Sequence, residues 1–524
     1  MPMIRIISTL ALLLATCGFA RASTPRLVVQ LVVSSMRAED LDRYAANFSD
    51  DGFLRLVRSG TRYTSGRYDY QQTTTPVSLA TLTTGAQPST HGVIALHWRD
   101  YVENEAVDLI RDKEGISPRQ LIAPTLGEAL LRDSPESRVV TVAAEPESAV
   151  VMAGRAGRAF WLDDIRCNWT TSAWYDPVLP EWIAQFNRER FNLSYLTEHW
   201  NSLLDRDRYR NRRTFDLVLQ PRTREEQRTP RSGELTLKND LERMLYTPAG
   251  NSAVLGFAKL AAAQYGLGAD ETPDLLNICL DAPRRIAEAY GPESAEMEDM
   301  YYRLDRELGD LLTFLEAQTG ENGLLVVLVS DHGTSPSYDA ADAVCDRFNT
   351  RQFEVILNSF LNVRYGVGDW LLEYEDKCIY LDHNLIYEKG LDLASVQNEV
   401  AAFAMQFRGV SHALTAAAMR TSYFGSGYAR RMQNSFYPRR SGDVLLNFMP
   451  GWIEQRDRCR SASGSMYGYD TDVPLIFYGP GITGREVRRP VDMTAVAPTL
   501  ARMLDIRRPA ASEGEVLAEI AGEE

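Results

Sequence analysis

The stretch Gly323-Leu324-Leu325-Val326-Val327-Leu328-Val329-Ser330-Asp331-His332-Gly333 decides the expected fold. An unbroken apolar run of this kind is typical of a strand buried on both faces of a parallel sheet. In open α/β sheets, ligands bind at the carboxyl ends of the strands. Asp331 and His332 follow the run, and such a pair can ligate a metal, orient a base or cap the next helix. The stretch therefore predicts a site at this edge of the sheet and leaves its chemistry open.

Other apolar runs predict further strands of the same sheet, at residues 26–35, 137–144, 275–281 and 473–481. Patterns typical of helices lie between or after them, at residues 38–59, 76–84, 295–318 and 492–504. The second of these helices begins with hydroxyl residues and Pro76, which is a good amino-terminal signal. Because strands and helices alternate, we predict an α/β fold, a doubly wound, mostly parallel sheet with helices on both faces.

Two long segments do not follow this alternation and are expected to be inserted cap regions, at about residues 155–265 and 349–466. The first is rich in Trp, Tyr, Arg and Asn, whereas the second is more strand-like. The aromatic residues between Trp161 and Trp200 can serve as core and loop anchors or as a platform for a ligand. The sequence thus predicts one core with two insertions.

Residues 1–22 have the pattern of a secretory signal peptide, with a short basic start, an apolar run at 6–15 and a small-residue ending. We expect cleavage before Ser23. The apolar run is too short to be a permanent membrane anchor. An alternative is a lipoprotein signal with the lipid on Cys17. Either pattern predicts a protein exported to the periplasm or secreted.

The composition limits the classes of partner. The chain of 524 residues has a net charge of −15 with mixed signs and is 44% hydrophobic, which argues against a nucleic-acid surface and predicts a sizeable core. No segment after the signal reaches transmembrane length. The mature chain keeps an odd number of cysteines, so at least one is free or pairs outside the chain. These are Cys167, Cys279, Cys345, Cys378 and Cys459.

A series of short motifs runs through the chain between about residues 26 and 516. They are Met36-Arg37, Thr84-Gly85, Thr90-His91-Gly92, Gly291-Pro292, Asp331-His332-Gly333, Arg440-Ser441-Gly442-Asp443, Pro450-Gly451-Trp452 and Val473-Pro474-Leu475. In this order they resemble the alkaline phosphatase superfamily, specifically the bacterial phosphate-irrepressible alkaline phosphatases and the nucleotide pyrophosphatase/phosphodiesterases. The resemblance implies one such domain over residues 23–524. It also implies phosphate ester hydrolysis by a Thr or Ser nucleophile between two zinc ions, which three Asp and three His residues hold.

The resemblance places Thr75 at the nucleophile position and Asp331 and His332 at one pair of zinc ligands. The other four ligand positions differ from the family pattern. They carry Ser34 and Arg284 in place of Asp, and Glu288 and Asp472 in place of His. The positions that bind phosphate in the family also differ. They carry Leu96, Glu145 and Glu147.

These substitutions predict a degenerate site. Arg284 stays protonated and cannot coordinate a metal, but it can pair with Glu288 four residues later and fill the vacated metal site. Glu145 and Glu147 repel a phosphate dianion. We therefore expect the zinc ions to be lost. One Mg or Ca ion remains possible, because carboxylates suit hard cations. Its candidate ligands are Glu288, Asp331, His332 and Asp472.

Three hypotheses about function follow. The first is a pseudophosphatase that kept the scaffold and serves binding or assembly with an envelope protein or ligand. The second is an active, metal-dependent hydrolase of a phosphate, sulfate or other ester, of the phosphomonoesterase or phosphodiesterase type, that uses Thr75 as the nucleophile in a remodelled site; otherwise Thr75 is a hydroxyl at a helix start. The third is a binding module that uses the aromatic insertion. If the match between this chain and the family's ligand positions is shifted by a few residues, Asp281 takes the ligand position in place of Arg284.

Overall fold

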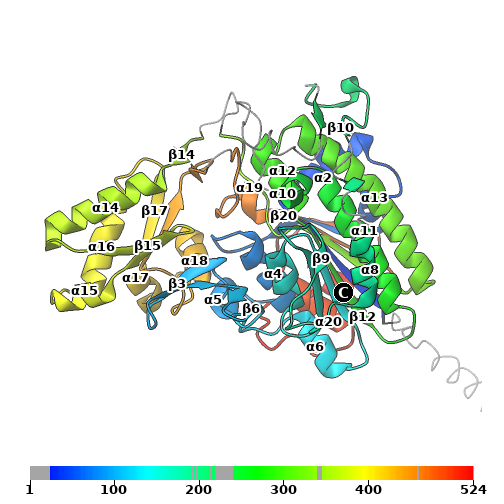
Figure 1. Ribbon diagram of the computed structural model, residues 1–524, viewed down its shortest axis with the longest axis horizontal. Coiled ribbons are helices and arrows are strands. Elements are labelled where there is room, and N and C mark those ends of the chain that lie inside the picture. Colours follow the sequence, from blue (N-terminus) through cyan, green and yellow to red (C-terminus); the bar gives the residue numbers. More distant parts are fainter. Residues whose placement is uncertain are drawn as a thin grey trace, which may run out of the picture.

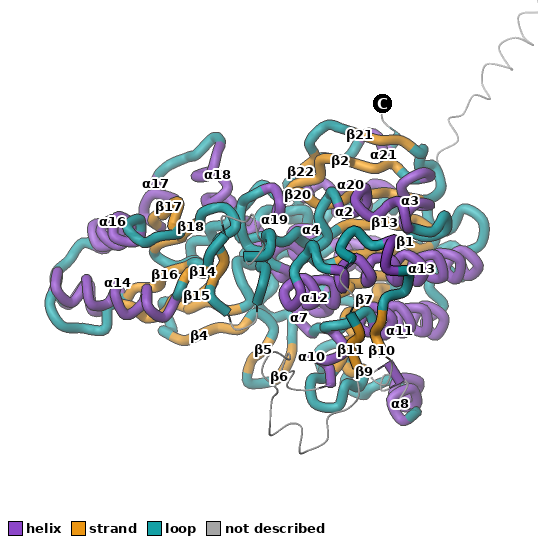
Figure 2. Tube along the Cα trace, turned by 90° about the horizontal axis from the view of Figure 1, so that it is seen from above, coloured by secondary structure: helices purple, strands orange, loops and turns teal. Residues whose placement is uncertain are grey.

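The computed structural model describes residues 24–189, 194–195, 199–212, 215–218, 240–338, 345–456 and 459–522. The expected signal peptide and Cys17 lie outside these residues. The described chain forms a larger lobe around a long sheet and a smaller lobe to its side, at the left of Figure 1. The view from above in Figure 2 shows the same two lobes. Within the described residues, no helix is both long enough and apolar enough to cross a membrane.

The larger lobe contains a ten-stranded sheet with the strand order β21-β2-β20-β13-β1-β12-β7-β8-β9, and β22 pairs with β2. Five neighbouring strands are parallel, namely β13 (Leu324–Val329), β1 (Leu27–Val33), β12 (Asp274–Leu280), β7 (Val139–Ala143) and β8 (Arg158–Leu162). The strand β20 (Asp472–Tyr478) is antiparallel to β13 and to β2 (Thr61–Arg67). The edges are formed by β9 (Trp169–Thr170), β21 (Arg485–Val487) and β22 (Val491–Asp492).

Helices cover both faces of this sheet, which confirms the predicted fold class. Alternate residues of β1 enter two different hydrophobic clusters, since Leu27 and Val29 belong to one and Val28 and Val32 to the other. The first cluster includes α11 (Ala249–Tyr265), α12 (Ala282–Tyr290) and α13 (Ala295–Thr319). The second includes α4 (Thr75–Thr84), α6 (Leu126–Asp133), α7 (Pro146–Ala153) and α20 (Val496–Met503).

The smaller lobe has a core of its own. Its antiparallel sheet has the order β15-β16-β18-β17, formed by Leu371–Glu375, Cys378–Leu381, Val444–Phe448 and Val410–Thr415. Its helices are α14 (Thr350–Tyr365), α15 (His383–Glu388), α16 (Leu393–Ala404), α17 (Ala416–Thr421) and α18 (Gly427–Asn434). Trp370 and Phe353 are buried in this lobe. The lobe falls within the range 349–466, for which an insertion was predicted.

The remaining elements are short. The helices are α2 (Asp40–Tyr44), η2 (Ala45–Asn47), α3 (Phe53–Ser59), α5 (Pro88–His91), α8 (Glu181–Arg188), η3 (Arg206–Arg208), α10 (Asp240–Leu245), α19 (Gly468–Thr471), η4 (Met493–Ala495) and α21 (Ala518–Ala521). The strands are β3 (His97–Asp100), β4 (Glu105–Asp108), β5 (Arg111–Asp112), β6 (Gly115–Ile116), β10 (His199–Asn201), β11 (Asp216–Val218), β14 (Arg347–Phe348) and β19 (Ile453–Glu454).

Part of the range 155–265, expected to be an insertion, belongs to the core. The strand β8 pairs with β7 in the central sheet, and α11 packs in the first hydrophobic cluster. Trp169 is fully buried and stacks on Phe257 with 3.9 Å between the ring centroids. The physical reason is that the aromatic residues fill space against the sheet. Trp161 and Trp200 are also buried, so most of the cluster anchors the core.

The helix predicted at residues 38–59 is interrupted between α2 and α3. The Asp305 carboxylate of α13 accepts hydrogen bonds from the Ser49 and Phe53 backbone N–H groups at 2.6 and 2.7 Å. Gly52 lies against the same residue, since a Cβ at Gly52 would be 2.1 Å from the Asp305 carbonyl oxygen. A long-range contact therefore ends one helix and starts the next.

We predict that Asp305→Ala lowers the free energy of unfolding by about 2–3 kcal/mol, because it removes two hydrogen bonds to a buried charged acceptor. Urea unfolding of wild type and variant measures the change. Asp310→Ala is the matched control, because Asp310 is exposed on the same helix. Equal effects of the two substitutions would contradict the role given to Asp305.

All five cysteines outside residues 1–22 lie in the described part of the chain, and each is a free thiol there.

Candidate functional site

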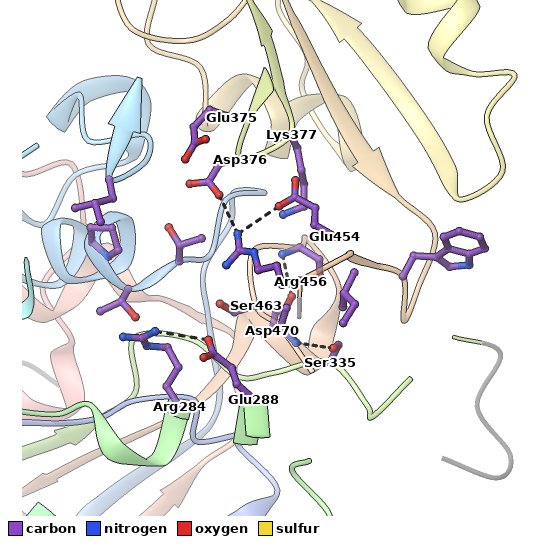
Figure 3. A pocket seen from close by; sticks show the side chains of 18 of the residues that line it. Arg284, Glu288, Ser335, Glu375, Asp376, Lys377, Glu454, Arg456, Ser463 and Asp470 are labelled. Carbon is purple, nitrogen blue, oxygen red and sulfur yellow. Dashed lines mark hydrogen bonds and ion pairs between the residues drawn. The ribbon is translucent and has the colours of Figure 1, made fainter. Parts of the chain in front are cut away.

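A cavity of about 360 Å³ lies between the two lobes. It is bordered by the start of α4, by α7 and α12 of the larger lobe, by the β15–β16 hairpin of the smaller lobe and by the loop around Ser463 (Figure 3). Ser34, Glu145, Asp281 and Asp331 follow β1, β7, β12 and β13. The carboxyl ends of these parallel strands therefore carry most of the predicted site residues, as expected for this kind of sheet.

Ser34, Asp331, His332 and Thr75 form one hydrogen-bonded cluster. The Asp331 carboxylate accepts from the Ser34 hydroxyl at 2.8 Å and from the His332 backbone N–H at 2.9 Å. His332 Nδ1 lies 2.6 Å from the Gly333 carbonyl, which can only accept, so this nitrogen carries a proton. The Thr75 hydroxyl lies 3.1 Å from His332 Nε2 and donates to it in the neutral ring. Asp331 and His332 are completely buried.

Arg284 takes part in a second cluster with Arg285, Glu145 and Glu288. The Glu145 carboxylate contacts both guanidinium groups, and Arg285 Nε donates to it at 2.8 Å. Glu288 lies 3.5 Å from each arginine. Burial raises the pKa of Glu145, but the two guanidinium groups outweigh burial and lower it to about 2. Two cations thus balance two carboxylates without any external ion.

Glu147 and Asp281 flank this cluster, and the pKa of each carboxyl group is raised. Burial and then the negative charge of Glu145 raise the pKa of Glu147 to about 8 and that of Asp281 to about 7. Asp281 accepts from the Ala144 and Glu145 backbone N–H groups at 3.0 Å each and from the Ser148 hydroxyl at 2.6 Å. Asp281 therefore holds the start of α7.

We predict that Glu147→Gln makes the protein more stable at high pH. The folded-state pKa lies above the unfolded value, so the carboxyl favours the folded state most below pH 4.5, and this contribution is lost as pH rises to about 8. The variant should gain about 1–3 kcal/mol relative to wild type between pH 5 and pH 8. Thermal unfolding at both values measures the gain. Glu136→Gln, at an exposed position of the same lobe, should gain nothing; equal gains would contradict the prediction.

Asp472 and Leu96 are the remaining predicted positions. Asp472 opens β20 opposite Arg67 of β2, and Arg67 donates to its two carboxylate oxygens at 2.6 and 3.2 Å. Leu96 is partly buried and lines the cavity. The candidate metal ligands are therefore divided among three groups, with Glu288 facing arginines, Asp472 facing Arg67, and Asp331 bonded within its own cluster.

The donors present do not fit the zinc pair that the resemblance implies. Ser34 donates its hydroxyl proton to Asp331, and Arg284 presents a guanidinium that has no lone pair to offer a metal. Among the residues that the structure describes, no three His, Cys, Asp or Glu side chains are grouped so as to hold a metal ion. The single Mg or Ca ion that the sequence left possible finds no such group in the described part of the chain either.

The cavity also contains residues that sequence reasoning missed. Lys377 lies at the tip of the β15–β16 hairpin and Asp470 lies in α19. Glu454 ends the short strand β19, and Arg456 comes two residues later. Arg456 reaches Glu454 at 3.3 Å and Asp376 at 3.6 Å (Figure 3). The sequence did not group these residues into a site, because they come together only when the two lobes meet.

Comparison with known proteins identifies the class of protein. The model of the type I phosphodiesterase / nucleotide pyrophosphatase family matches residues 28–470, so the chain belongs to this family. Among particular relatives, the chain is similar to alkaline phosphatase PafA of Elizabethkingia meningoseptica, with 28% identity over 95% of both chains. It is also similar to alkaline phosphatase PhoV of Synechococcus elongatus, with 27% identity over 95% of this chain and 93% of that one. These matches confirm the resemblance seen in the sequence.

The fold agrees with a solved relative. The crystal structure of wild-type alkaline phosphatase PafA superposes with a TM-score of 0.86 at 26% identity, covering 95% of this chain and 99% of that one. Murine ectonucleotide pyrophosphatase/phosphodiesterase 5 shares the fold, with a TM-score of 0.52 at 12% identity.

Proposed function

We propose that this member of the family is a pseudophosphatase: it has lost zinc-dependent phosphate ester hydrolysis and uses the cavity between its lobes to bind a ligand. The observation that carries the proposal is the ion-pair cluster around Arg284. A protonated guanidinium with Glu145 and Glu288 as partners supplies internally the positive charge that a metal would otherwise supply. The cluster stabilises the fold without metal and leaves Thr75 without an activating ion.

The charges near Arg284 also oppose a phosphate substrate. Two like charges 4 Å apart repel each other by about 4 kcal/mol at an effective dielectric constant of about 20. Glu288 and Glu147 line the cavity near Arg284, and Glu147 adds a negative charge there when it is ionised. Arg284 and Arg285 are already engaged with carboxylates, so they cannot offset the charge of a phosphate dianion as free cations would.

The test is the metal content and the phosphatase activity of the purified protein after incubation with zinc, magnesium and calcium and extensive dialysis. We expect far less than one zinc per chain by elemental mass spectrometry. We also expect wild type and Thr75→Ala to show the same background rate with nitrophenyl phosphate and with bis(nitrophenyl) phosphate. Stoichiometric zinc together with Thr75-dependent turnover would overturn the proposal.

One observation favours a second candidate function, a hydrolase that works without metal at Thr75. The Thr75 hydroxyl lies 3.1 Å from His332 Nε2, and the Gly333 carbonyl orients the same ring. A hydroxyl beside an oriented imidazole is the arrangement that activates nucleophiles in acyl transfer. This candidate predicts hydrolysis of nitrophenyl carboxylic esters that resists chelators, is lost in Thr75→Ala and is retained in Thr75→Ser. Equal rates in wild type and Thr75→Ala would exclude it.

We further propose that the protein acts in the periplasm or outside the cell. The support is the signal-like pattern of residues 1–22, with Cys17 as the alternative lipid site. Fractionation of cells that produce the full chain, with mass spectrometry of the mature amino terminus, tests the location. A mature chain that begins at Ser23 supports cleavage, and a cytoplasmic chain that retains Met1 would contradict it.

A further inference from the structure

The lysine at the tip of the β15–β16 hairpin is held in an unusual backbone conformation. The hairpin has a two-residue loop, Asp376-Lys377, between the paired residues Glu375 and Cys378. Both loop residues have positive φ, 43° for Asp376 and 66° for Lys377. Loops of this type favour Asn-Gly or Asp-Gly, because glycine adopts positive φ without strain. A lysine in the glycine position is thus locally unfavourable, and such strain persists where the surroundings fix it and often marks function.

The surroundings fix this loop against the larger lobe. The Gln72 amide donates to the Asp376 carbonyl at 3.1 Å, and the Leu446 backbone N–H donates to the Lys377 carbonyl at 2.8 Å. Gly464 lies beside the lysine, since a Cβ on Gly464 would be 2.9 Å from Lys377 Nζ and 3.2 Å from Thr74 Cγ2. The hairpin therefore brings the Lys377 ammonium next to the residue that precedes Thr75.

The Lys377 ammonium faces the cavity, and no carboxylate of the described residues lies within 4 Å of it. Lys377 is only 8% exposed and lines the cavity (Figure 3). The other lining cations, Arg284, Arg456 and His97, each have a carboxylate within 4 Å. Within the described chain Lys377 has neither an ion pair nor a side-chain hydrogen bond, and its ammonium lies 5.9 Å from the Phe448 ring centroid, at the outer limit of a cation–π contact. A nearly buried charge of this kind requires a partner.

A second lining group lacks a partner on the same wall. Asp470 is 1% exposed, and its Oδ2 accepts from the Ser465 backbone N–H at 2.8 Å, whereas its Oδ1 has no hydrogen-bond partner. The buried Thr74 hydroxyl also has no hydrogen-bond partner among the residues that the structure describes. Among the described lining residues, the cavity thus offers the Lys377 ammonium and the Asp470 Oδ1 acceptor for a ligand, and its volume is within the range of small-molecule sites.

We propose that the cavity binds a small carboxylate-bearing molecule, with its carboxylate on Lys377 and a neighbouring hydroxyl or amino group on Asp470. The inference rests on the proposed function, because it treats the cavity as a binding site. A single negative charge matches one free cation, whereas a phosphate dianion would bring a second charge beside Glu288, Asp376 and Glu454. Hydroxy acids, amino acids and sugar acids have the required pair of groups.

The test is calorimetric titration of the purified protein with D-glucuronate, lactate, acetate, glucose and inorganic phosphate, at about 50 mM ionic strength so that screening stays moderate. We expect glucuronate and lactate to bind more tightly than acetate, which lacks the second group, and than glucose, which lacks the carboxylate. Lys377→Gly should bind glucuronate about 10- to 100-fold more weakly. Its melting temperature should not fall, because glycine suits φ of 66°. Lys377→Arg should retain part of the affinity.

Four results would overturn the inference: equal glucuronate affinity in wild type and Lys377→Gly, no carboxylate binding at about 10 mM, tighter binding of phosphate than of glucuronate, or acetate as tight as glucuronate. The zinc content of the same sample is measured separately. Stoichiometric zinc together with Thr75-dependent phosphatase turnover would overturn the proposed function, whereas equal glucuronate binding by wild type and Lys377→Gly would overturn this inference alone.

Discussion

Glu145→Ala is expected to lower the free energy of unfolding by about 3–5 kcal/mol, which is the typical effect of removing one partner of a buried ion pair. The Glu145 side chain is 5% exposed and contacts both Arg284 and Arg285, of which Arg284 is 14% exposed. Among the described carboxylates, truncation leaves Glu288 as the one within 4 Å of the two neighbouring guanidinium groups, at 3.5 Å from each. Urea unfolding followed by circular dichroism at neutral pH measures the loss.

Two further variants give the Glu145 result its meaning. Asp50→Ala removes an exposed ion pair with Arg58 in the same lobe and should change stability by less than about 1 kcal/mol. Glu145→Leu combined with Arg284→Met removes one charge of each sign and should recover at least half of the loss, because apolar groups can replace a buried ion pair. A loss as small as that of Asp50→Ala would show that the cluster does not anchor this part of the fold.

Most of the fold could be predicted because the signals are local. The apolar runs of β1, β7, β12, β13 and β20 and the amphipathic pattern of α13 lie within single segments of sequence. The interruption between α2 and α3 could not be predicted, because it depends on Asp305, about 250 residues further along the chain. Likewise, the sequence did not indicate whether the aromatic residues near Trp169 face the core or the solvent, because this depends on the contact of Trp169 with Phe257, which is distant in the sequence.

The candidate site could be predicted only in part, for the same reason. The pairing of Arg284 with Glu288 follows from their four-residue spacing on a helix, but the Glu145 contact spans 139 residues. The resemblance to the family pattern places Asp472 among the candidate metal ligands. Asp472 faces Arg67 instead, because β2 was not recognised in the sequence and its antiparallel pairing with β20 places the two side chains opposite each other. Lys377 gave no signal, because a lysine in a hairpin loop is ordinarily solvated.

Restoring the family ligands should restore zinc binding. We expect the combined variant Ser34→Asp, Arg284→Asp, Glu288→His and Asp472→His to bind zinc more than about 100-fold more tightly than wild type, because loss of even one supporting partner of a metal site typically weakens it about 10- to 100-fold. Ser34→Asp puts a carboxylate in place of a hydroxyl that donates to Asp331, and Arg284→Asp removes the charge that repels a cation. Competition with a zinc indicator and the zinc retained after dialysis measure the gain.

The decisive control keeps Arg284 and makes the other three substitutions. It should bind little zinc, because the guanidinium remains in contact with Glu145 at the position that a metal ligand requires. Arg284→Asp in the full set leaves Glu145 paired with Arg285, so the α7 end of the site keeps a counterion and the variant is expected to fold. If the three-substitution protein binds zinc as tightly as the complete set, Arg284 is not what excludes the metal. If neither binds, the matching of the ligand positions between the chain and its family is incorrect.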